Sequence, residues 1–503
     1  MDHLSESLTC ESYPSGARNL LCFYDSHKHE QVIKVVLRFE MGTISISGPA
    51  HVPFSILDPR TNNRVSRAPA MQYPNIKDYV LESGMELEDL VMDLIPSPEL
   101  SVAKEANLVL RDYQKKALSN WGRAGMKGCV VLPTGSGKTL VGVKAIEKVN
   151  AASMIVVPTI DLMDQWRTVL SKYFKNVNVG MLGGGEDDIQ PITVATYDSA
   201  YIRAPILGNR FALLIFDEVH HLAAPGYRTI AEQFASPYRL GLTATIERED
   251  NMHKDIPSLV GGVVFEAFPE ELANKKHLAP YEIERRRVDM LPSEVQEYNR
   301  HFGLYQVGLK KLGLRMNYPG SFQRLIMMAG RNPAAREAML ARNKAMDIAL
   351  NSRAKLEELK EILSDYRGAK TLVFTQHNKL VHDISSMFFI PCITHKTGKE
   401  ERQDVLGGFK EGRYMAIVTS KVLDEGVDVP DAELGVILSG TGSSREFIQR
   451  LGRLLRPKPE AGKKATLVEI VSSDTREVGT SAKRKRGMTD ARSRAAEERE
   501  GRG

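Results

Sequence analysis

The chain has 503 residues, of which 42% are hydrophobic and 26% are charged, a balance typical of soluble globular proteins. One compact core does not extend over so long a chain, so we expect two to four domains. The net charge of +5 is compatible with a nucleic-acid partner but does not identify one. Its four cysteines lie far apart without a CxxC pair, which excludes the usual zinc and iron–sulfur spacings.

Neither a membrane segment nor a targeting signal is expected. The apolar runs are far shorter than the roughly 20 residues that cross a bilayer. The chain begins Met-Asp-His-Leu-Ser-Glu, without the basic stretch and apolar stretch of a secretory signal. We therefore expect a cytoplasmic protein, or a nuclear one if the source is a eukaryote, with no membrane partner.

The first predicted elements are two short strands within residues 31–57, joined by a turn at Met41-Gly42, because apolar and polar residues alternate in the second of them. They predict a small β-containing domain over residues 1–100. Proline-rich segments without periodicity, at 58–74 and 96–98, favour a domain boundary near residue 100.

Apolar strands then alternate with helical patterns, which predicts βαβ units and parallel sheets covered on both faces. The expected strands of a first lobe, residues 101–275, are 128–132, 154–157, 192–195, 211–216 and 238–242. Those of a second lobe, residues 346–475, are 371–374, 390–393, 415–419, 434–438 and 466–471.

Two further segments differ from the lobes in composition. Residues 276–345 are rich in Lys, Arg, Met and Tyr at helical spacing, so we expect a helical insert or bridge there. Residues 476–503 are polar and charged, which predicts a disordered tail. Within it, the run 483–486 (KRKR) is interpreted as solvated tail, with a localisation signal or a nucleic-acid contact as alternatives.

The strongest motif is PTGSGKT, which follows the apolar strand 129–132 and precedes a helical pattern. Its backbone N–H groups can surround phosphate oxygens, Lys138 can neutralise the β/γ charge, and Thr139 can ligate Mg²⁺. Leu132 stands where the common pattern has its first glycine, and a plain glycine-rich turn is the alternative. The motif comprises Pro133, Thr134, Gly135, Ser136, Gly137, Lys138 and Thr139.

A second motif, Asp217-Glu218-Val219-His220-His221, directly follows a buried strand. The carboxyl end of such a strand faces the ligand crevice in open α/β sheets. We therefore expect Asp217 to hold Mg²⁺ and Glu218 to orient and deprotonate the attacking water. A solvated acidic turn is the alternative. Adjacent histidines face apart, so a coupling role near the γ-phosphate is preferred for His220 over a zinc site.

The third motif, QRLGRLLR at residues 449–456, places arginines every three residues on a predicted helix. Such a face can stabilise γ-phosphate charge through Arg453 and Arg456 if it meets the phosphate-binding loop across a cleft. A basic helix on the protein surface is the alternative.

These motifs in this order, joined by Thr-Ala-Thr at 243–245 and TSKVLDEGVDVP at 419–430, resemble the superfamily 2 helicases. Within that superfamily, DEVHH and the Arg-Glu-Asp element at 248–250 are similar to the XPB-type DNA repair helicases, including archaeal ones. The resemblance covers about residues 106–475, and residues 1–100 resemble the damage-recognition region of that family by position and size. It implies an α/β fold of two RecA-like lobes that use ATP and Mg²⁺, with a helical thumb around residues 298–324.

The resemblance also implies residue roles. Adenine and nucleotide contacts would come from Arg111, Gln114, Gly426, Asp428 and Gln449. Coupling of hydrolysis to movement would involve His220, Thr243, Ala244 and Thr245. DNA contacts would come from Pro158, Thr159, Gln165, Trp166, Thr196, Arg248, Glu249, Asp250, Thr375, His377, Thr419 and Ser420, although each threonine or serine is equally suited to a turn or a helix cap.

We therefore expect an ATP-dependent DNA helicase or duplex translocase, acting in DNA repair or promoter opening, with 3′–5′ polarity taken from the resemblance. Expected partners are single-stranded and duplex DNA and a nuclease or a repair or transcription factor, and a monomer is expected. Two alternatives stay open: an RNA helicase or non-unwinding translocase of the same superfamily, and a non-catalytic ATP-gated clamp on nucleic acid.

Overall fold

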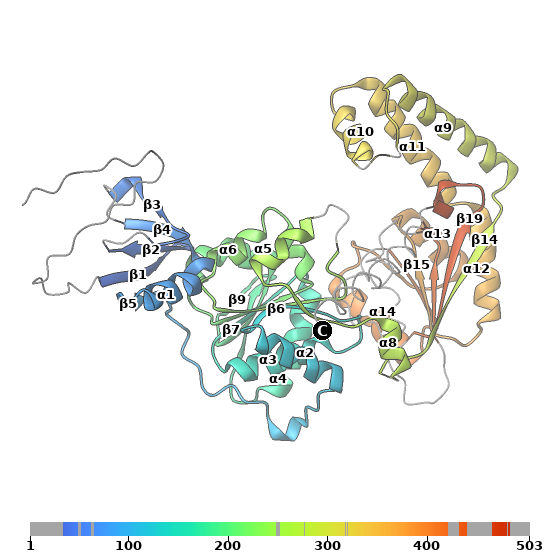
Figure 1. Cartoon of the computed structure of the whole chain (residues 1–503). Coiled ribbons are helices and arrows are strands. Elements are labelled where there is room, and N and C mark those ends of the chain that lie inside the picture. The colour runs from blue at the N-terminus through green and yellow to red at the C-terminus, as the bar shows by residue number, and fades with distance from the viewer. Residues whose placement is uncertain are drawn as a thin grey trace, which may run out of the picture.

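The computed structural model describes residues 34–48, 52–61, 65–247, 252–275, 277–316, 318, 320–420, 432–439, 465–479 and 481–482. Within them the chain forms three sheets and a separate group of helices (Figure 1). Several expected site residues lie outside the described residues, namely Arg248, Glu249, Asp250, Gly426, Asp428, Gln449, Arg453, Arg456 and the basic run 483–486.

The N-terminal sheet has the strand order β3-β4-β2-β1-β5 and packs against one helix. Its elements are β1 (Lys34–Glu40), β2 (Thr43–Ser47), β3 (Ile56–Leu57), β4 (Val65–Pro69), α1 (Tyr73–Glu82) and β5 (Glu86–Leu90). Strands β1 and β2 pair in antiparallel fashion around Met41 and Gly42, which both have positive φ, as a tight hairpin turn requires. The predicted hairpin is confirmed.

The second sheet has the order β13-β6-β12-β11-β7-β10-β8-β9 and is parallel apart from the β8–β9 pair. We call this sheet and its helices the first lobe, residues 112–274. Its strands are β6 (Lys127–Val131), β7 (Ser153–Val157), β8 (Val179–Gly183), β9 (Glu186–Asp187), β10 (Ile192–Thr196), β11 (Leu213–Asp217), β12 (Tyr238–Thr243) and β13 (Val263–Glu266).

Helices cover the sheet of the first lobe, as the expected βαβ units require. They are α2 (Asp112–Arg123), α3 (Lys138–Val149), α4 (Ile160–Tyr173), α5 (Tyr197–Leu207), α6 (Arg228–Gln233), α7 (Ile256–Leu259) and α8 (Pro269–Asn274). Short 3-10 turns across the chain are η1 (Pro59–Thr61), η2 (Ala70–Gln72), η3 (Lys104–Ala106), η4 (Val219–Ala223) and η5 (Met252–Asp255). A Cβ atom on Gly42 would lie 2.8 Å from the side chain of Gln233, so the N-terminal hairpin rests directly on α6.

The third sheet is entirely parallel, with the order β14-β19-β18-β15-β17-β16. With its helices it forms the second lobe: β14 (Tyr281–Val288), α12 (Arg353–Asp365), β15 (Thr371–Phe374), α13 (Asn378–Phe388), β16 (Cys392–Ile393), α14 (Lys399–Glu411), β17 (Ala416–Thr419), β18 (Leu434–Ile437) and β19 (Ala465–Ser472). Two α/β lobes with parallel sheets confirm the expected fold class.

Three helices, which we call the thumb, extend from the second lobe (Figure 1). They are α9 (Pro292–Lys311), α10 (Ser321–Ala329) and α11 (Pro333–Leu350), with their own small core around Tyr305 and Leu325. A Cβ atom on Gly308 would lie 2.6 Å from that of Ala338, so glycine lets α9 and α11 approach closely.

The start of the expected helical insert was wrong, because residues 281–288 form strand β14 and pair with β19 along its whole length. Its sequence, YEIERRRV, carries charged side chains that conceal the strand pattern. Arg285 and Arg286 find carboxylate partners in Glu469 and Glu358, which makes a charged edge strand compatible with the fold.

The start of the expected disordered tail was also wrong. Residues 476–479 and 481–482 are helical, and the side chains of Glu477 and Ser481 are 1% exposed. Composition predicted a solvated segment, but partners distant in sequence make burial of these polar side chains favourable. Among the described helices, none combines the length and the apolar character that crossing a membrane requires.

Candidate functional site

The loop 133–137 joins β6 to the N-terminus of α3. Gly135 and Gly137 have φ of 79° and 82°, a conformation that side chains disfavour. A Cβ atom on Gly137 would also lie 2.5 Å from the amide nitrogen of Gln114. Because backbone N–H groups and the helix dipole converge at such an end, the loop has the properties of an anion-binding site.

Two side chains of α2 support this loop from behind. The hydroxyl of Tyr113 donates to the Ser136 carbonyl at 2.6 Å, and Nε2 of Gln114 donates to the same oxygen at 2.9 Å. Oε1 of Gln114 accepts from the backbone N–H of Arg111. Sequence reasoning assigned Gln114 to adenine and did not select Tyr113. In the structure Gln114 is 2% exposed and braces the loop.

The side chains of the loop are held close to its backbone. Nζ of Lys138 donates to the Leu132 carbonyl at 3.1 Å, and the Ser136 hydroxyl donates to the Pro133 carbonyl at 2.6 Å. The buried hydroxyl of Thr134 has no hydrogen-bond partner within the described part of the chain. Thr139 lies in the first turn of α3, beside the loop, where a hydroxyl can reach a cation bound to phosphate.

Strand order brings the acidic motif to the same edge of the sheet. β6, β12 and β11 are neighbours and parallel, so the loop after β6 lies at the same end of the sheet as Thr243 and Asp217, the last residues of β12 and β11. Asp217 is 6% exposed, and it accepts from Nε1 of Trp166 at 2.7 Å and from the N–H of Glu218 at 3.0 Å. Burial and the neighbouring Glu218 raise the pKa of Asp217 to about 6, opposed by Trp166 and Lys138.

Glu218, His220 and Thr243 form a buried cluster. The hydroxyl of Thr243 lies 3.2 Å from Oε2 of Glu218 and 3.1 Å from Nδ1 of His220, and it also accepts from the N–H of Thr245. Glu218 has φ of 48°, a strained conformation that is often found at functional sites. The structure therefore links the acidic motif to the Thr-Ala-Thr segment through direct contacts.

Trp166 was expected at a DNA-gripping segment, and the structure places it elsewhere. It is 1% exposed, it bonds Asp217, and its ring lies where a Cβ atom on Gly142 would approach within 2.6 Å. Its role is thus to orient the acidic carboxylate between α3 and α4. No spacing rule in the sequence predicts this contact, because 51 residues separate the two partners.

We expect Trp166→Phe to lower the ATPase rate about tenfold, because a hydrogen bond to a charged group contributes about 1.5–3 kcal/mol. Steady-state ATPase rates and thermal unfolding measure the effect. The matched control is Trp121→Phe, since the indole of this other buried tryptophan donates to the Arg239 carbonyl, not to a carboxylate. If both variants lose stability and activity equally, Trp166 has no special role in orienting Asp217.

Two expected DNA-contacting residues of the first lobe, Thr159 and Thr196, lie directly before helices. Thr159 caps α4 by accepting from the N–H of Leu162, and Thr196 caps α5 by accepting from that of Ser199. Pro158 precedes the first cap and is half-buried. The threonine hydroxyls thus serve the caps, while the helix N-termini add N–H groups that suit phosphate oxygens.

In the second lobe, three of the expected DNA-contacting side chains are buried. Thr375 and Thr419 are fully buried and Ser420 is 4% exposed. The Thr375 hydroxyl lies 2.8 Å from that of Ser439, and the Thr419 hydroxyl donates to the Ser420 carbonyl. Because these hydroxyls already contact other protein atoms, the expectation that they contact DNA directly is not supported in this arrangement.

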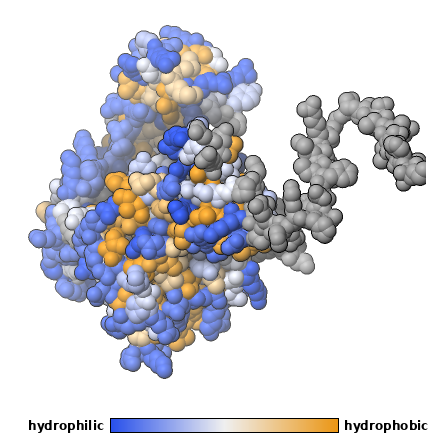
Figure 2. All heavy atoms as spheres, turned by 90° about the vertical axis from the view of Figure 1, so that its left-hand side faces the viewer, coloured by the Kyte–Doolittle hydropathy of each residue, from blue (hydrophilic) through white to orange (hydrophobic). Residues whose placement is uncertain are grey.

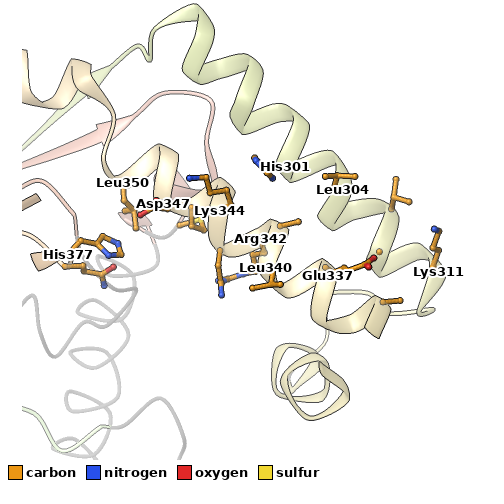
Figure 3. Close-up of a pocket in the computed structure, with 18 residues that line it drawn as sticks. His301, Leu304, Lys311, Glu337, Leu340, Arg342, Lys344, Asp347, Leu350 and His377 are labelled. Carbon is orange, nitrogen blue, oxygen red and sulfur yellow. The ribbon is translucent and has the colours of Figure 1, made fainter. Parts of the chain in front are cut away.

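His377 instead borders a groove between the thumb and the second lobe. The groove has a volume of about 1160 Å³, and His377 lies at one end of it while α9 and α11 form its length (Figure 3). Lys311, Arg342 and Lys344 bring positive charge to its lining. The thumb, at the top of Figure 2, shows a mixture of apolar and hydrophilic side chains on the face in view. Met327 is an exposed apolar residue of the thumb, and the exposed Leu304 lines the groove.

One ion pair links the two lobes directly. Nη1 of Arg402, on α14, lies 2.5 Å from Oδ2 of Asp161, in the first turn of α4. Both side chains are partly buried. The carboxylate follows the Thr159 cap, so the lobes meet beside one of the expected DNA-contacting segments.

Two parallel-sheet lobes with a phosphate-binding loop, an acidic motif at its side and a Thr-Ala-Thr segment in contact with that motif define a superfamily 2 helicase. Three protein-family profiles match the chain. "Type III restriction enzyme, res subunit" matches residues 107–248, and "ERCC3/RAD25/XPB C-terminal helicase" matches residues 348–492. "Xeroderma pigmentosum group B helicase damage recognition domain" matches residues 37–91.

Curated relatives agree with these matches. The "DNA 3'-5' translocase XPB2" of Sulfurisphaera tokodaii is 45% identical over 83% of this chain and 92% of its own. The "DNA 3'-5' helicase XPB" of Mycobacterium tuberculosis is 31% identical over 82% of this chain and 70% of its own. The chain belongs to the XPB family of helicases.

Two more distant similarities complete the comparison. The XPB/SSL2 subunit of the general transcription and DNA repair factor IIH of Saccharomyces cerevisiae is 28% identical over 84% of this chain and 47% of its own. Among solved structures, the Hef helicase domain of Pyrococcus furiosus aligns with a TM-score of 0.48 at 19% identity, over 75% of this chain and 98% of that one.

Proposed function

We propose that this chain is an ATP-driven motor that moves along DNA with 3′–5′ polarity and acts in DNA repair or promoter opening. The observation that carries the proposal is the group formed by Lys138, Asp217, Glu218 and Thr243 at one edge of the first sheet. The family supplies the polarity, since relatives at 45% and 31% identity are named 3′–5′ enzymes.

Within the site, the carboxylates have distinct roles. Asp217 and Thr139 provide oxygen atoms of the type that Mg²⁺ prefers, and the raised pKa of the buried Asp217 carboxyl fits a position that a cation stabilises. When bound there, Mg²⁺ would supply positive charge against the β and γ phosphates. Lys138 leaves the Leu132 carbonyl to bind phosphate, and Glu218 orients the attacking water and accepts its proton.

The second lobe completes the nucleotide site in this proposal. Gly426, Asp428 and Gln449 would contact the nucleotide, and Arg453 and Arg456 would stabilise γ-phosphate charge. Arg111 would contact adenine, while Gln114 holds the phosphate-binding loop through the Ser136 carbonyl. ATP then favours the closed arrangement of the lobes, and hydrolysis removes that preference. Ala244 and Thr245 directly follow Thr243, which contacts Glu218, so we propose that this segment couples hydrolysis to movement.

The requirement for Mg²⁺ should increase as the pH falls through about 6, the pKa of Asp217. Above that pH the Asp217 carboxylate is ionised and can bind a cation. Below that pH a proton competes with Mg²⁺, so each further drop of one pH unit should raise the Mg²⁺ concentration needed about tenfold. ATPase titrations with Mg²⁺ at several pH values test this. In Trp166→Phe the increase in the Mg²⁺ requirement should begin at a higher pH, because the hydrogen bond from the Trp166 indole lowers the pKa of Asp217. A requirement independent of pH contradicts the assignment.

The proposal is tested by strand displacement and ATP hydrolysis on DNA with 3′ tails, 5′ tails or blunt ends, with and without ATP. We expect activity that depends on ATP and on a 3′ tail, and ATPase stimulation by DNA. Stronger stimulation by RNA would favour an RNA helicase. ATP-gated DNA binding without turnover would favour a non-catalytic clamp.

A duplex translocase that does not separate strands is a second candidate. It is favoured by the name of the relative from Sulfurisphaera tokodaii, a translocase. Displacement of a third strand from triplex DNA detects movement along an intact duplex. Activity in this assay without strand separation would support the second candidate.

Partners and organisation follow the same proposal. Relatives from yeast and Enterocytozoon bieneusi are named as subunits of a transcription and repair factor, and we propose a repair or transcription factor, or a nuclease, as partner of a monomeric chain. We propose functional units at 1–100 and 101–275, a thumb at 292–350, and a second lobe that also includes strand β14 and the buried segment up to residue 482. A DNA substrate favours a cytoplasmic location, or a nuclear one in a eukaryote.

A further inference from the structure

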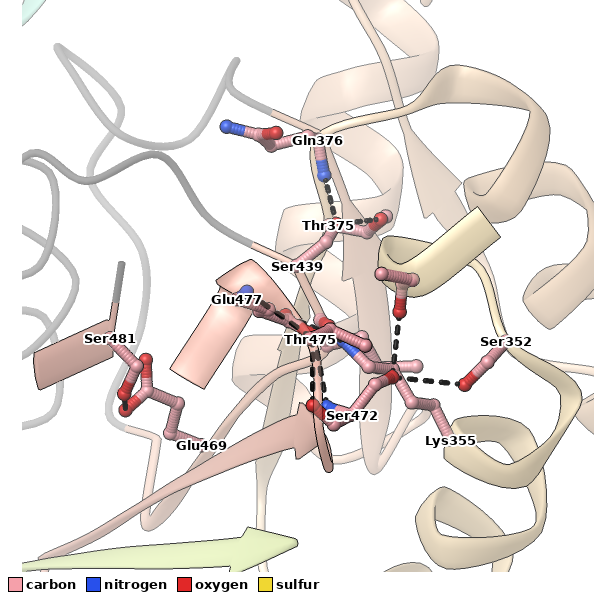
Figure 4. Close-up of polar contacts among 12 residues, drawn as sticks. Ser352, Lys355, Thr375, Gln376, Ser439, Glu469, Ser472, Thr475, Glu477 and Ser481 are labelled. Carbon is pink, nitrogen blue, oxygen red and sulfur yellow. Dashed lines mark hydrogen bonds and ion pairs between the residues drawn. The ribbon is translucent and has the colours of Figure 1, made fainter. Parts of the chain in front are cut away.

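A buried ion pair joins α12 to the segment that follows β19. Lys355 and Glu477 are each 1% exposed, and Nζ of the lysine donates to the two carboxylate oxygens at 2.6 and 2.7 Å. Figure 4 shows Lys355 and Glu477 among the polar residues that surround them. The same ammonium donates to the Leu438 carbonyl at 2.6 Å. Its three protons thus meet three acceptors. Buried ion pairs are often no more stabilising than apolar side chains of similar size. We therefore interpret this pair as one that positions the segments it joins.

On one side, the pair fixes the end of strand β18. Leu438 directly follows this strand, and the next residue, Ser439, accepts from the N–H of Gln376 at 2.8 Å. Its hydroxyl also lies 2.8 Å from that of Thr375. The lysine therefore determines the position of the segment 375–377 that borders the groove at the thumb. Beyond Ser439 the chain continues toward Arg453 and Arg456, which lie outside the described residues.

On the other side, the segment 472–477 contacts the thumb. The N–H of Arg476 donates to the Tyr298 hydroxyl at 3.1 Å, and its guanidinium lies 5.2 Å from the ring centre of Phe302. The Ser472 hydroxyl donates to the Ala349 carbonyl near the end of α11 at 2.7 Å. This segment is closed on itself, because Glu477 also accepts from the N–H of Ser472 at 3.0 Å.

We propose that Lys355 and Glu477 are positioning residues that couple the thumb to the strand ends of the second lobe. The segment 472–477 holds thumb helices at one end and, through the ion pair, the end of β18 at the other. A displacement of the lobe on hydrolysis is thereby passed to the thumb. The inference rests on the proposed motor function and specifies how that motor transmits movement. Without the pair, ATP is hydrolysed but less DNA is moved for each ATP.

The central variant is the double substitution Lys355→Met and Glu477→Leu, which removes both charges and keeps the volume. Lys355→Met alone leaves a buried carboxylate and should lower the melting temperature strongly, whereas the double variant should recover most of it. A second variant, Arg476→Met, removes the guanidinium that lies over the Phe302 ring of the thumb. The residue is exposed and its backbone bond to Tyr298 remains, so this variant should fold normally. The matched control is Lys360→Met with Glu361→Leu, on the exposed face of the same helix.

The measurement compares ATP hydrolysis with movement, by triplex displacement on duplex DNA. For the double variant we expect about tenfold slower movement and an ATPase rate without DNA within about twofold of wild type, because the pair transmits movement and does not contact the nucleotide. Arg476→Met should change movement in the same direction. The exposed control should behave as wild type in both assays.

The outcomes separate the two proposals. If the wild-type chain hydrolyses ATP without moving on DNA, the motor function is wrong. If wild type moves and both the double variant and Arg476→Met move equally fast per ATP, the ion pair is merely structural. Should the double variant fail to fold, Arg476→Met decides alone, because wild-type coupling in that variant would overturn the inference. A parallel loss of DNA-free ATPase and movement would likewise contradict a coupling role.

Discussion

Glu218→Gln should reduce ATP hydrolysis by about 10²- to 10⁴-fold, the usual contribution of a general base, while ATP and DNA still bind. The substitution keeps the size of the side chain and its contact with Thr243, which lies 3.2 Å from Oε2, but it removes the proton acceptor. ATPase rates measure the loss of hydrolysis. Equilibrium titrations with nucleotide and with DNA measure whether the affinity for each is retained.

The control for this experiment is Glu361→Gln, a glutamate on the exposed face of α12. It should hydrolyse ATP as wild type does. A Glu218→Gln protein that turns over ATP at a rate near wild type would remove Glu218 from the role of base. Loss of ATP binding in this variant would assign the side chain to nucleotide affinity instead.

Lys138→Met should weaken ATP binding by about 10- to 100-fold, because a charge-assisted hydrogen bond contributes about 1.5–3 kcal/mol, and it should abolish measurable hydrolysis. In the structure this ammonium bonds the Leu132 carbonyl, so the chain without nucleotide should lose little stability. Equilibrium binding of a fluorescent ATP analogue and thermal unfolding test the two expectations.

Lys148→Met is the matched control, since Lys148 is an exposed lysine on the same helix. It should bind ATP normally. If Lys138→Met keeps the affinity of wild type, the loop 133–139 does not bind the phosphates in the proposed manner. A large loss of stability in Lys138→Met would show that the bond to Leu132 matters more for folding than for nucleotide.

Local patterns were sufficient where chemistry depends on neighbours in the chain. The loop 133–139, the acidic motif and the hairpin at Met41-Gly42 were all predictable, since glycine conformation, strand ends and turn residues are local properties. Family membership was also accessible, because the order of the motifs is a property of the chain. Edge strands such as β14 were missed, since charged side chains with distant partners interrupt the apolar alternation.

Contacts across long separations depended on the folded arrangement. Trp166 reaches Asp217, Gln114 reaches the loop at Ser136, and Lys355 reaches Glu477 over 122 residues. The composition of the tail predicted a solvated segment, yet Glu477 is buried. A carboxylate can be buried when an opposite charge, here Lys355, pairs with it. The motifs alone therefore established the class of chemistry. Packing determined which side chains orient the carboxylates and connect the thumb, since burial and strand order bring together residues that no sequence spacing relates.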